Sequence, residues 1–165
     1  MKKEIKSLVD KGEMLPLMEA FYTIQGEGYH KGTAAYFIRI GGCDVGCHWC
    51  DVKESWNADL HPPTSIEKIV ANAARSSNTV VVTGGEPLIW NMEPLTQMLG
   101  KNNLKIHIET SGAYDLTGIW DWICLSPKSG STIGPSDSNP TIPSTQVAAG
   151  HGSASTAVQS TARWR

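Results

Sequence analysis

Short apolar segments alternate with amphipathic segments from residue 34 to residue 126, and no other feature constrains the fold so strongly. Four of the apolar segments have the length and composition of buried strands: Ala34–Ile40, Thr79–Thr83, Leu104–Glu109 and Trp122–Ser126. Strands that alternate with helices through short connections predict a parallel α/β sheet with right-handed crossovers. In such a sheet the functional loops follow the carboxyl ends of the strands.

Two helices are expected between these strands. The first covers Thr64 to Ala74, where apolar residues recur on one helical face. A capping box opens this helix, with Thr64 as the N-cap and Glu67 as its third residue. The second helix is expected to start at Asn91.

The charge balance argues against one class of function. The 165 residues include 14 Lys and Arg against 16 Asp and Glu, a formal net charge of -2. A protein that tracks phosphates needs a basic excess, so we expect no nucleic-acid binding. Neither a membrane-spanning apolar run of ~20 residues nor a secretory signal is recognisable, so we expect a cytoplasmic protein that does not associate with membranes. Cysteines in that compartment are expected to be thiols or metal ligands.

The chain changes character near residue 128. The segment from Ser129 to Arg165 is rich in Ser, Thr, Gly and Pro, and its apolar residues follow neither a helical nor a strand period. So little apolar surface does not offset an ordering entropy of ~1–2 kcal/mol per residue. We therefore expect a folded core over residues 1–128 and a low-complexity tail over residues 129–165 that is disordered or non-native.

The strongest chemical signal is the Cys-x3-Cys-x2-Cys run formed by Cys43, Cys47 and Cys50, directly after the first predicted strand. Glycines in this loop let the backbone curl, so that three thiolates can meet at one metal centre. A structural zinc site wants four protein ligands, and His48 or Cys124 would have to supply the fourth. An iron–sulfur cube held by three cysteines leaves one iron open for chemistry. We favour the iron–sulfur centre and keep two alternatives, a zinc site and an accidental run of cysteines that binds no metal.

A second motif, Thr83-Gly84-Gly85-Glu86-Pro87, directly follows a predicted strand. Its two glycines allow a ligand to approach the backbone closely, and Glu86 offers a carboxylate to an ammonium group. Alone, the segment is typical of an ordinary strand-to-helix turn. Beside the cysteine run, it makes the sequence resemble the radical S-adenosylmethionine superfamily.

Within that superfamily the sequence is similar to the 7-carboxy-7-deazaguanine synthases of queuosine biosynthesis. The likeness runs in consistent order from about Met14 to Lys128. It is carried by the segments Phe21–Gly28, Phe37–Arg39, Cys43–Asp51, Thr83–Pro87, Glu109–Gly112 and Ser126–Lys128. The resemblance implies an α/β fold, a partial (β/α) barrel of radical S-adenosylmethionine type that is truncated on its C-terminal side.

The resemblance also implies roles for individual residues. A [4Fe–4S] cluster would be held by Cys43, Cys47 and Cys50. Contacts to S-adenosylmethionine would come from Gly85, Glu86, Ser126, Pro127 and Lys128. Substrate contacts would come from Ile24, Gln25, Gly26, Arg39 and Thr83, with the planar guanidinium of Arg39 pairing with a carboxylate. No catalytic residue is assigned.

Two positions depart from the family pattern. The family commonly holds Mg²⁺ through a Thr or Ser hydroxyl two residues after the third cysteine, where this chain has Val52. Asp51, waters and the substrate carboxylate are the ligands that remain for Mg²⁺. Ser111 stands where the family pattern has Asn.

The implied activity is that of a carbon–nitrogen lyase, which converts 6-carboxy-5,6,7,8-tetrahydropterin to 7-carboxy-7-deazaguanine with loss of ammonia. The implied partners are this pterin, an electron donor such as flavodoxin or ferredoxin, and a second copy of the chain in a homodimer. Three alternatives stay open. They are an activating enzyme for a glycyl-radical partner, a structural zinc module, and an inactive fragment whose open barrel exposes apolar strand surface.

Overall fold

A computed structural model describes residues 3–127 and 147–149 of the chain. The predictions for Lys128 and for the tail over residues 129–165 therefore lie outside the described residues, apart from the strand at 147–149. The elements follow in chain order as α1 (Lys3–Asp10), β1 (Met14–Ile24), β2 (Ala34–Ile40), η1 (Lys53–Ser55), η2 (Ala58–Leu60), β3 (Pro63–Ser65), α2 (Ile66–Ser76), β4 (Thr79–Gly84), η3 (Pro87–Ile89), α3 (Glu93–Lys101), β5 (Lys105–Thr110), β6 (Trp122–Leu125) and β7 (Val147–Ala149).

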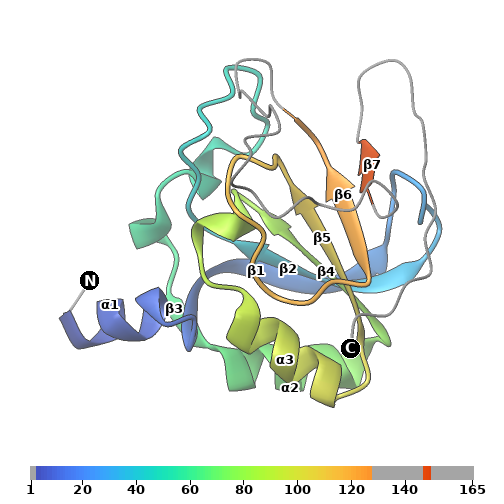
Figure 1. The fold of residues 1–165 in the computed structure, drawn as a ribbon, viewed down its shortest axis with the longest axis horizontal. Helices are drawn as coiled ribbons and strands as arrows, with labels where there is room; N and C mark the ends of the chain where they lie inside the picture. The colour runs from blue at the N-terminus through green and yellow to red at the C-terminus, as the bar shows by residue number, and fades with distance from the viewer. Residues whose placement is uncertain (1–2, 128–146, 150–165) are drawn as a thin grey trace.

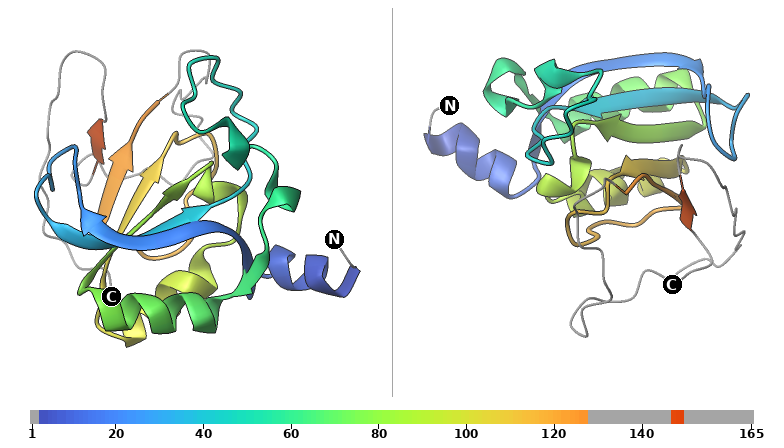
Figure 2. Two further views of the ribbon diagram at one scale, coloured as in Figure 1. Left: turned by 180° about the vertical axis from the view of Figure 1, so that it is seen from behind. Right: turned by 90° about the horizontal axis from the view of Figure 1, so that it is seen from above.

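The strands form one seven-stranded sheet in the order β3-β1-β2-β4-β5-β6-β7 (Figures 1 and 2). The neighbours β2, β4, β5 and β6 are parallel, which confirms the predicted α/β sheet in this part of the chain. The predicted sheet was incomplete, because β1 was not foreseen and pairs antiparallel with both β2 and β3. A short connection between β1 and β2 reverses the chain direction, whereas a parallel pair needs a longer crossover.

Helices α2 and α3 lie together beneath the sheet in the view of Figure 1. The face of α2 predicted to be apolar is buried at Ile66, Ile69, Val70 and Ala73. These side chains join those of alternate strand residues in the main core, among them Ile38, Val82 and Ile108. Because side chains alternate along a strand, the residues between them point to the opposite face of the sheet, here called the inner face.

The predicted start of α2 is wrong by one residue. The N-cap is Ser65, whose hydroxyl accepts the Lys68 N–H at 3.5 Å. Thr64 instead lies in β3 opposite Leu15, so its backbone stays extended within the sheet. Helix α3 likewise begins at Glu93 rather than at Asn91, because the Asn91 side chain precedes the helix and accepts the Glu93 N–H at 3.1 Å.

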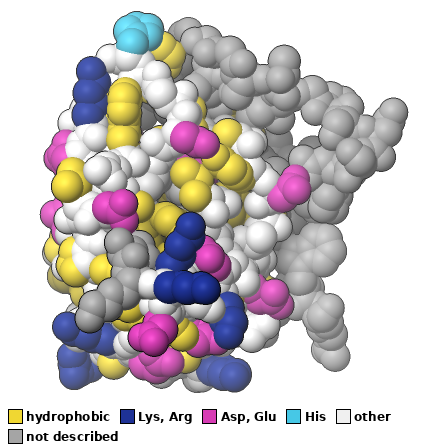
Figure 3. All heavy atoms as spheres, turned by 90° about the vertical axis from the view of Figure 1, so that its left-hand side faces the viewer, with side chains coloured by type: hydrophobic (Ala, Val, Ile, Leu, Met, Phe, Trp, Pro, Cys, Tyr) yellow, Lys and Arg dark blue, Asp and Glu magenta, His cyan; other side chains and the backbone are white. Residues whose placement is uncertain are grey.

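The surface on the side of α1 mixes both signs of charge. Figure 3 shows basic and acidic side chains gathered together at the lower end of this face, with hydrophobic side chains among them and above them. Such mixing produces no broad basic field on the described part of this face. Within the described residues, no helix is both long enough and apolar enough to span a membrane.

Candidate active site

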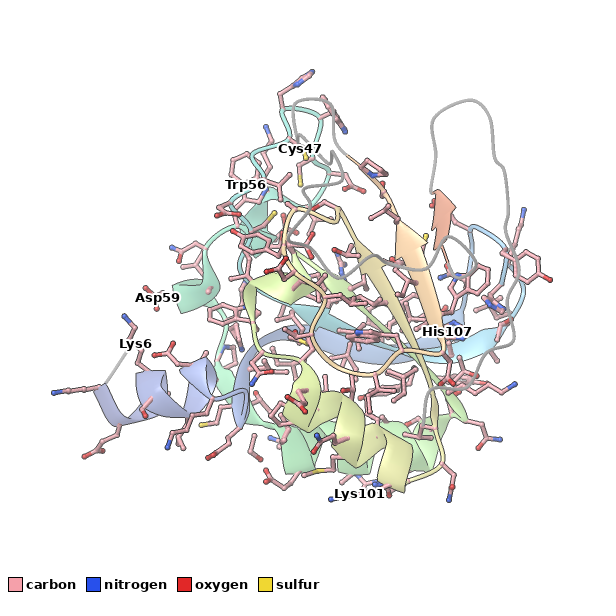
Figure 4. All side chains as sticks on the ribbon, in the orientation of Figure 1. Lys6, Cys47, Trp56, Asp59, Lys101 and His107 are labelled. Atoms are coloured by element: carbon pink, nitrogen blue, oxygen red, sulfur yellow. The ribbon has the colours of Figure 1, made fainter. Side chains whose placement is uncertain are left out.

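The parallel strands run toward the end of the molecule that carries the predicted site. In Figure 1 the arrows of β5 and β6 point to the same end as the loop after β2. Figure 4 places Cys47 at this end and His107 toward the other. The loop of residues 43–50, here called the cysteine loop, and the turn of residues 84–87, here called the GGEP turn, follow β2 and β4. The structure therefore brings the two sequence motifs to one edge of the sheet, as predicted.

The GGEP turn packs directly against the start of the cysteine loop. The Gly85 N–H donates to the Ile40 carbonyl at 2.8 Å, and the Glu86 N–H donates to the Gly42 carbonyl at 2.9 Å. A Cβ added to Gly85 would collide with the Gly42 carbonyl oxygen and would lie 3.1 Å from the Cys43 Cβ. Glycine at position 85 is therefore what permits this close approach.

Glu86 does not have the role that the sequence predicted for it. Its side chain is only 1% exposed. One carboxylate oxygen accepts the Thr110 hydroxyl at 2.6 Å and the Leu88 N–H at 3.1 Å. The other accepts the N–H and the hydroxyl of Ser111 at 2.8 and 2.5 Å. Because a carboxylate accepts about four hydrogen bonds, Glu86 is fully used in fixing the GGEP turn to the end of β5 and has no free position for an ammonium group.

Five residues form one row across the inner face, here called the polar row. Arg39 lies opposite Glu19 on β1 and opposite Thr83 on β4, and Glu109 on β5 lies opposite Cys124 on β6. These are positions near the carboxyl ends of β2, β4 and β5, next to the cysteine loop and the GGEP turn. The row thus lies where ligands bind in sheets of this type.

A hydrogen-bonded network centres on Glu109 in this row. The Gln25 amide donates to one carboxylate oxygen at 2.8 Å, and the Thr83 hydroxyl donates to the other at 2.8 Å. Glu109, for which the sequence predicted no role, thereby joins two predicted substrate residues that are 58 positions apart. The alternation of Lys105, His107 and Glu109 with buried isoleucines was the signal that could have placed Glu109 on the inner face.

Arg39 forms an ion pair with Glu19 through its Nη1 atom. The Arg39 side chain is 22% exposed and that of Glu19 is 45% exposed. A guanidinium carries five N–H donors, so this single bond leaves a second edge of Arg39 for another carboxylate.

The other predicted ligand residues lie around the same edge. Ile24 ends β1 with a side chain that is 63% exposed, and Gly26 follows Gln25 into the connection to β2. Ser126 and Pro127 follow β6, and the Ser126 N–H donates to the Thr110 carbonyl at 2.8 Å.

A second row crosses the same inner face next to the polar row, two residues farther from the carboxyl ends of the parallel strands. It is largely aromatic, and we call it the aromatic floor. Its members face one another across the strands in the order Phe21, Phe37, Val81, His107 and Trp122. The Phe21 and Phe37 rings stack with centroids 5.8 Å apart. The connection from β1 to β2 covers the far end of the floor, where Tyr29 stacks on Trp122 at 5.0 Å and His30 lies 4.5 Å from the His107 ring.

His107 makes stability depend on pH. Burial, followed by the nearby charges of His30 and Lys105, lowers the pKa of His107 from 6.5 to about 4. Because the unfolded chain binds the proton more readily than the folded chain, the free energy of unfolding is highest above pH 6.5 and decreases as the pH falls toward 4. We expect His107→Phe, which keeps a ring in the aromatic floor, to make this decrease in the free energy of unfolding smaller by about 2–3 kcal/mol.

Urea unfolding of the metal-free protein at pH 7.5 and at pH 4.5, with and without the substitution, measures this difference. Parallel stability curves for the two proteins would show that His107 is not the group responsible.

Chemically, the cysteine loop fits an iron–sulfur cluster. Its three cysteines are free thiols and are partly buried. Burial is the main cause that raises the pKa of the Cys43 thiol, and the nearby Glu86, Cys47 and Cys50 raise it further. Across residues 3–127 and 147–149, no three His, Cys, Asp or Glu side chains converge on one point. Cluster binding would therefore turn these thiols toward one another, and the left-handed Gly46, with φ of 68°, already bends the loop between them.

Near its start, at Asp44, the cysteine loop is held by a side chain that the sequence did not single out. The hydroxyl of Tyr114, in the connection from β5 to β6, donates to the carboxylate of Asp44. This hydrogen bond, with burial as a smaller cause, raises the pKa of Tyr114 from 10 to about 12.

Comparison with known proteins agrees with this arrangement. A sequence profile of the Radical SAM superfamily matches residues 37–133, more than half of the chain. The chain belongs to this superfamily. The superfamily binds S-adenosylmethionine and a [4Fe–4S] cluster, as the sequence predicted.

Individual relatives confirm the narrower resemblance. The 7-carboxy-7-deazaguanine synthase of Flavobacterium psychrophilum is 75% identical over 126 residues, which cover 76% of this chain and 60% of that protein. The synthase of the same name from Synechocystis sp. is 50% identical over 114 residues, covering 68% of this chain and 55% of that protein. The chain thus spans about 60% or less of the length of these relatives.

A solved structure supports the fold. The crystal structure of QueE from Escherichia coli matches with a TM-score of 0.68 at 34% identity, over 80% of this chain and 67% of that one. The prediction of a partial barrel of this superfamily is confirmed by that match.

Proposed function

We propose that this chain forms the catalytic core of a 7-carboxy-7-deazaguanine synthase, a carbon–nitrogen lyase that converts 6-carboxy-5,6,7,8-tetrahydropterin to 7-carboxy-7-deazaguanine and ammonia. The observation that carries the proposal is the polar row, with Arg39 and Glu109 two strands apart beside the cysteine loop. The 75% identity to a protein of that name supports it.

The polar row suits a flat bicyclic substrate with a carboxylate at one end and N–H donors at the other. Arg39 and Glu109 are separated by β4, so their backbones lie about 10 Å apart. In our proposal the free edge of Arg39 pairs with the substrate carboxylate, and Glu109 accepts N–H groups from the pyrimidine edge of the pterin.

Gln25 and Thr83 orient the acceptor in this scheme. Each donates to a different oxygen of Glu109, which fixes the plane of the carboxylate before the substrate arrives. Phe21 and Phe37, which stack in the aromatic floor, give the ring an apolar support and help to exclude water from that side.

When bound, the cluster and S-adenosylmethionine would supply the radical that takes hydrogen from the substrate. The cluster would be held by Cys43, Cys47 and Cys50, and the methionine part of the cofactor would rest on the backbone of Gly85. Ser126, Pro127 and Lys128 are proposed as further contacts to that cofactor. Glu86 serves the same site indirectly, because its four hydrogen bonds fix the turn that carries Gly85.

The remaining predictions join this proposal. A Mg²⁺ ion would be held by Asp51, waters and the substrate carboxylate, because Val52 offers no ligand atom. A flavodoxin or ferredoxin would supply the electron, two copies would form a homodimer, and the protein would work in the cytoplasm.

Anaerobic reconstitution with iron and sulfide, followed by incubation with S-adenosylmethionine, dithionite and the carboxypterin, tests the proposal. We expect both 5′-deoxyadenosine and 7-carboxy-7-deazaguanine. Formation of 5′-deoxyadenosine without the deazaguanine would overturn the proposed substrate and leave the superfamily. A zinc-loaded, colourless protein that forms neither product would favour a structural metal module.

Arg39→Lys is expected to raise KM for the carboxypterin by about 10- to 100-fold, because an ammonium cannot form a two-pronged pair with a carboxylate. Steady-state kinetics of the reconstituted protein measure the change. Arg75→Lys is the matched control, because Arg75 lies at the exposed end of α2 and donates to Asn72. Equal KM values for the Arg39 variant and the unmodified protein would remove Arg39 from the substrate site.

A further inference from the structure

The last residue of β5 and the residues that follow it reach both loops of the candidate active site. Thr110 and Ser111 donate to Glu86 and so hold the GGEP turn. Three residues later, the hydroxyl of Tyr114 donates to Asp44 in the cysteine loop. One five-residue segment, residues 110–114, thus connects the turn proposed to carry the cofactor with the loop proposed to carry the cluster. We call this segment the brace.

The cysteine loop has few hydrogen bonds to the rest of the described chain, so the bond from Tyr114 to Asp44 is important for its position. Its beginning is fixed by the backbone, where the Cys43 N–H donates to the Trp56 carbonyl at 3.2 Å. Between Asp44 and Cys50, the bond from the Cys50 N–H to the Cys47 carbonyl is internal to the loop. Among hydrogen bonds between described residues, the one from Tyr114 is the sole tie from positions 44–50 to another part of the chain.

The two partners differ in rigidity. The ring of Tyr114 packs against the main core, so its hydroxyl is already oriented. Asp44 is exposed on a loop whose thiols are not drawn together. A preoriented donor loses little conformational entropy when it binds a carboxylate, and such charge-assisted bonds are strong for their kind.

We propose that Tyr114 is a positioning residue for the cluster. Through its hydrogen bond to Asp44, Tyr114 holds the cysteine loop over the GGEP turn. Tyr114 touches neither the cluster nor the substrate in this scheme. The inference rests on the cluster-binding part of the proposed function and is independent of the identity of the substrate.

Tyr114→Phe keeps the ring and removes the hydroxyl. In the metal-free protein we expect alkylation of Cys47 and Cys50, followed by mass spectrometry, to become about fivefold faster. In the reconstituted protein we expect iron to pass to a chelator faster by a similar factor. Tyr22→Phe is the control, because this exposed tyrosine lies on β1, and its rates should equal those of the unmodified protein.

A double-mutant cycle separates positioning from a general loss of structure. Asp44→Ala should raise the same rates as Tyr114→Phe, and the double variant should be no faster than either single one. Additive effects, or unchanged rates in Tyr114→Phe, would overturn the proposal. If Tyr114→Phe does not fold, Asp44→Ala at the exposed loop carries the test, and an unchanged rate there overturns it too. The rates of alkylation and of iron release are measured without the pterin. Failure to form the deazaguanine would therefore refute the proposed substrate without affecting the test of Tyr114.

Discussion

Gly85→Ala is expected to abolish binding of S-adenosylmethionine to the reconstituted protein and to destabilise the chain by about 3 kcal/mol. The added methyl group would collide with the Gly42 carbonyl oxygen and lie 2.9 Å from the Gly42 carbonyl carbon. Both are backbone atoms, so no rotation of a side chain relieves the overlap. The turn would have to move away from the cysteine loop.

Two measurements check this result, urea unfolding of the metal-free protein and equilibrium binding of the cofactor. Gly100→Ala is the matched control, because a methyl group added at Gly100 in α3 meets no atom within 4 Å. We expect that change to leave cofactor binding intact and to stabilise the helix by up to ~1 kcal/mol. Normal binding by the Gly85 variant would show that the two loops separate at little cost.

Cys47→Ser is expected to prevent assembly of a stable cluster, because a serine hydroxyl is not a soft thiolate ligand. After anaerobic reconstitution we expect most of the iron, the broad visible absorption and the cleavage of S-adenosylmethionine to be lost. Cys47 belongs to the loop that the superfamily profile covers.

Cys124→Ser is the control for Cys47→Ser, because it makes the same change at a cysteine that is not expected to bind the cluster. Cys124 lies on β6 at the end of the polar row, outside the cysteine loop. We expect this variant to keep its iron and its visible absorption. Loss of iron in the Cys124 variant would identify a fourth protein ligand and would close the coordination position on which the proposed chemistry depends.

The sequence predicted those parts of the fold in which one residue pattern has one physical solution. A continuous apolar run such as Thr79–Thr83 is stable mainly as a buried strand, and β4 lies there. The apolar face of α2 was recognised for the same reason. The cap of α2 was misplaced because Thr64 and Ser65 both have a hydroxyl that can cap a helix, and the pairing of Thr64 with Leu15 in the sheet decides between them.

The sequence predicted the motifs of the site but not the hydrogen bonds that connect them. Glu86 was recognised as important, yet its role depends on Thr110 and Ser111, which reach it only after β4 and β5 have paired. Glu109 joins Gln25 to Thr83 for the same reason. Hydrogen bonds between residues far apart in sequence are set by strand order, and strand order is not encoded in any single motif.

The polar row takes one residue from each of five strands, whereas the connections between those strands contribute only at its margins. Lengthening a connection would leave the row in place. Inserting one residue inside β4 or β5 would turn every later side chain of that strand to the other face and would place a valine or an isoleucine where the row now has a hydroxyl or a carboxylate. We therefore expect related chains to vary freely in loop length while tolerating almost no insertion or deletion within these strands.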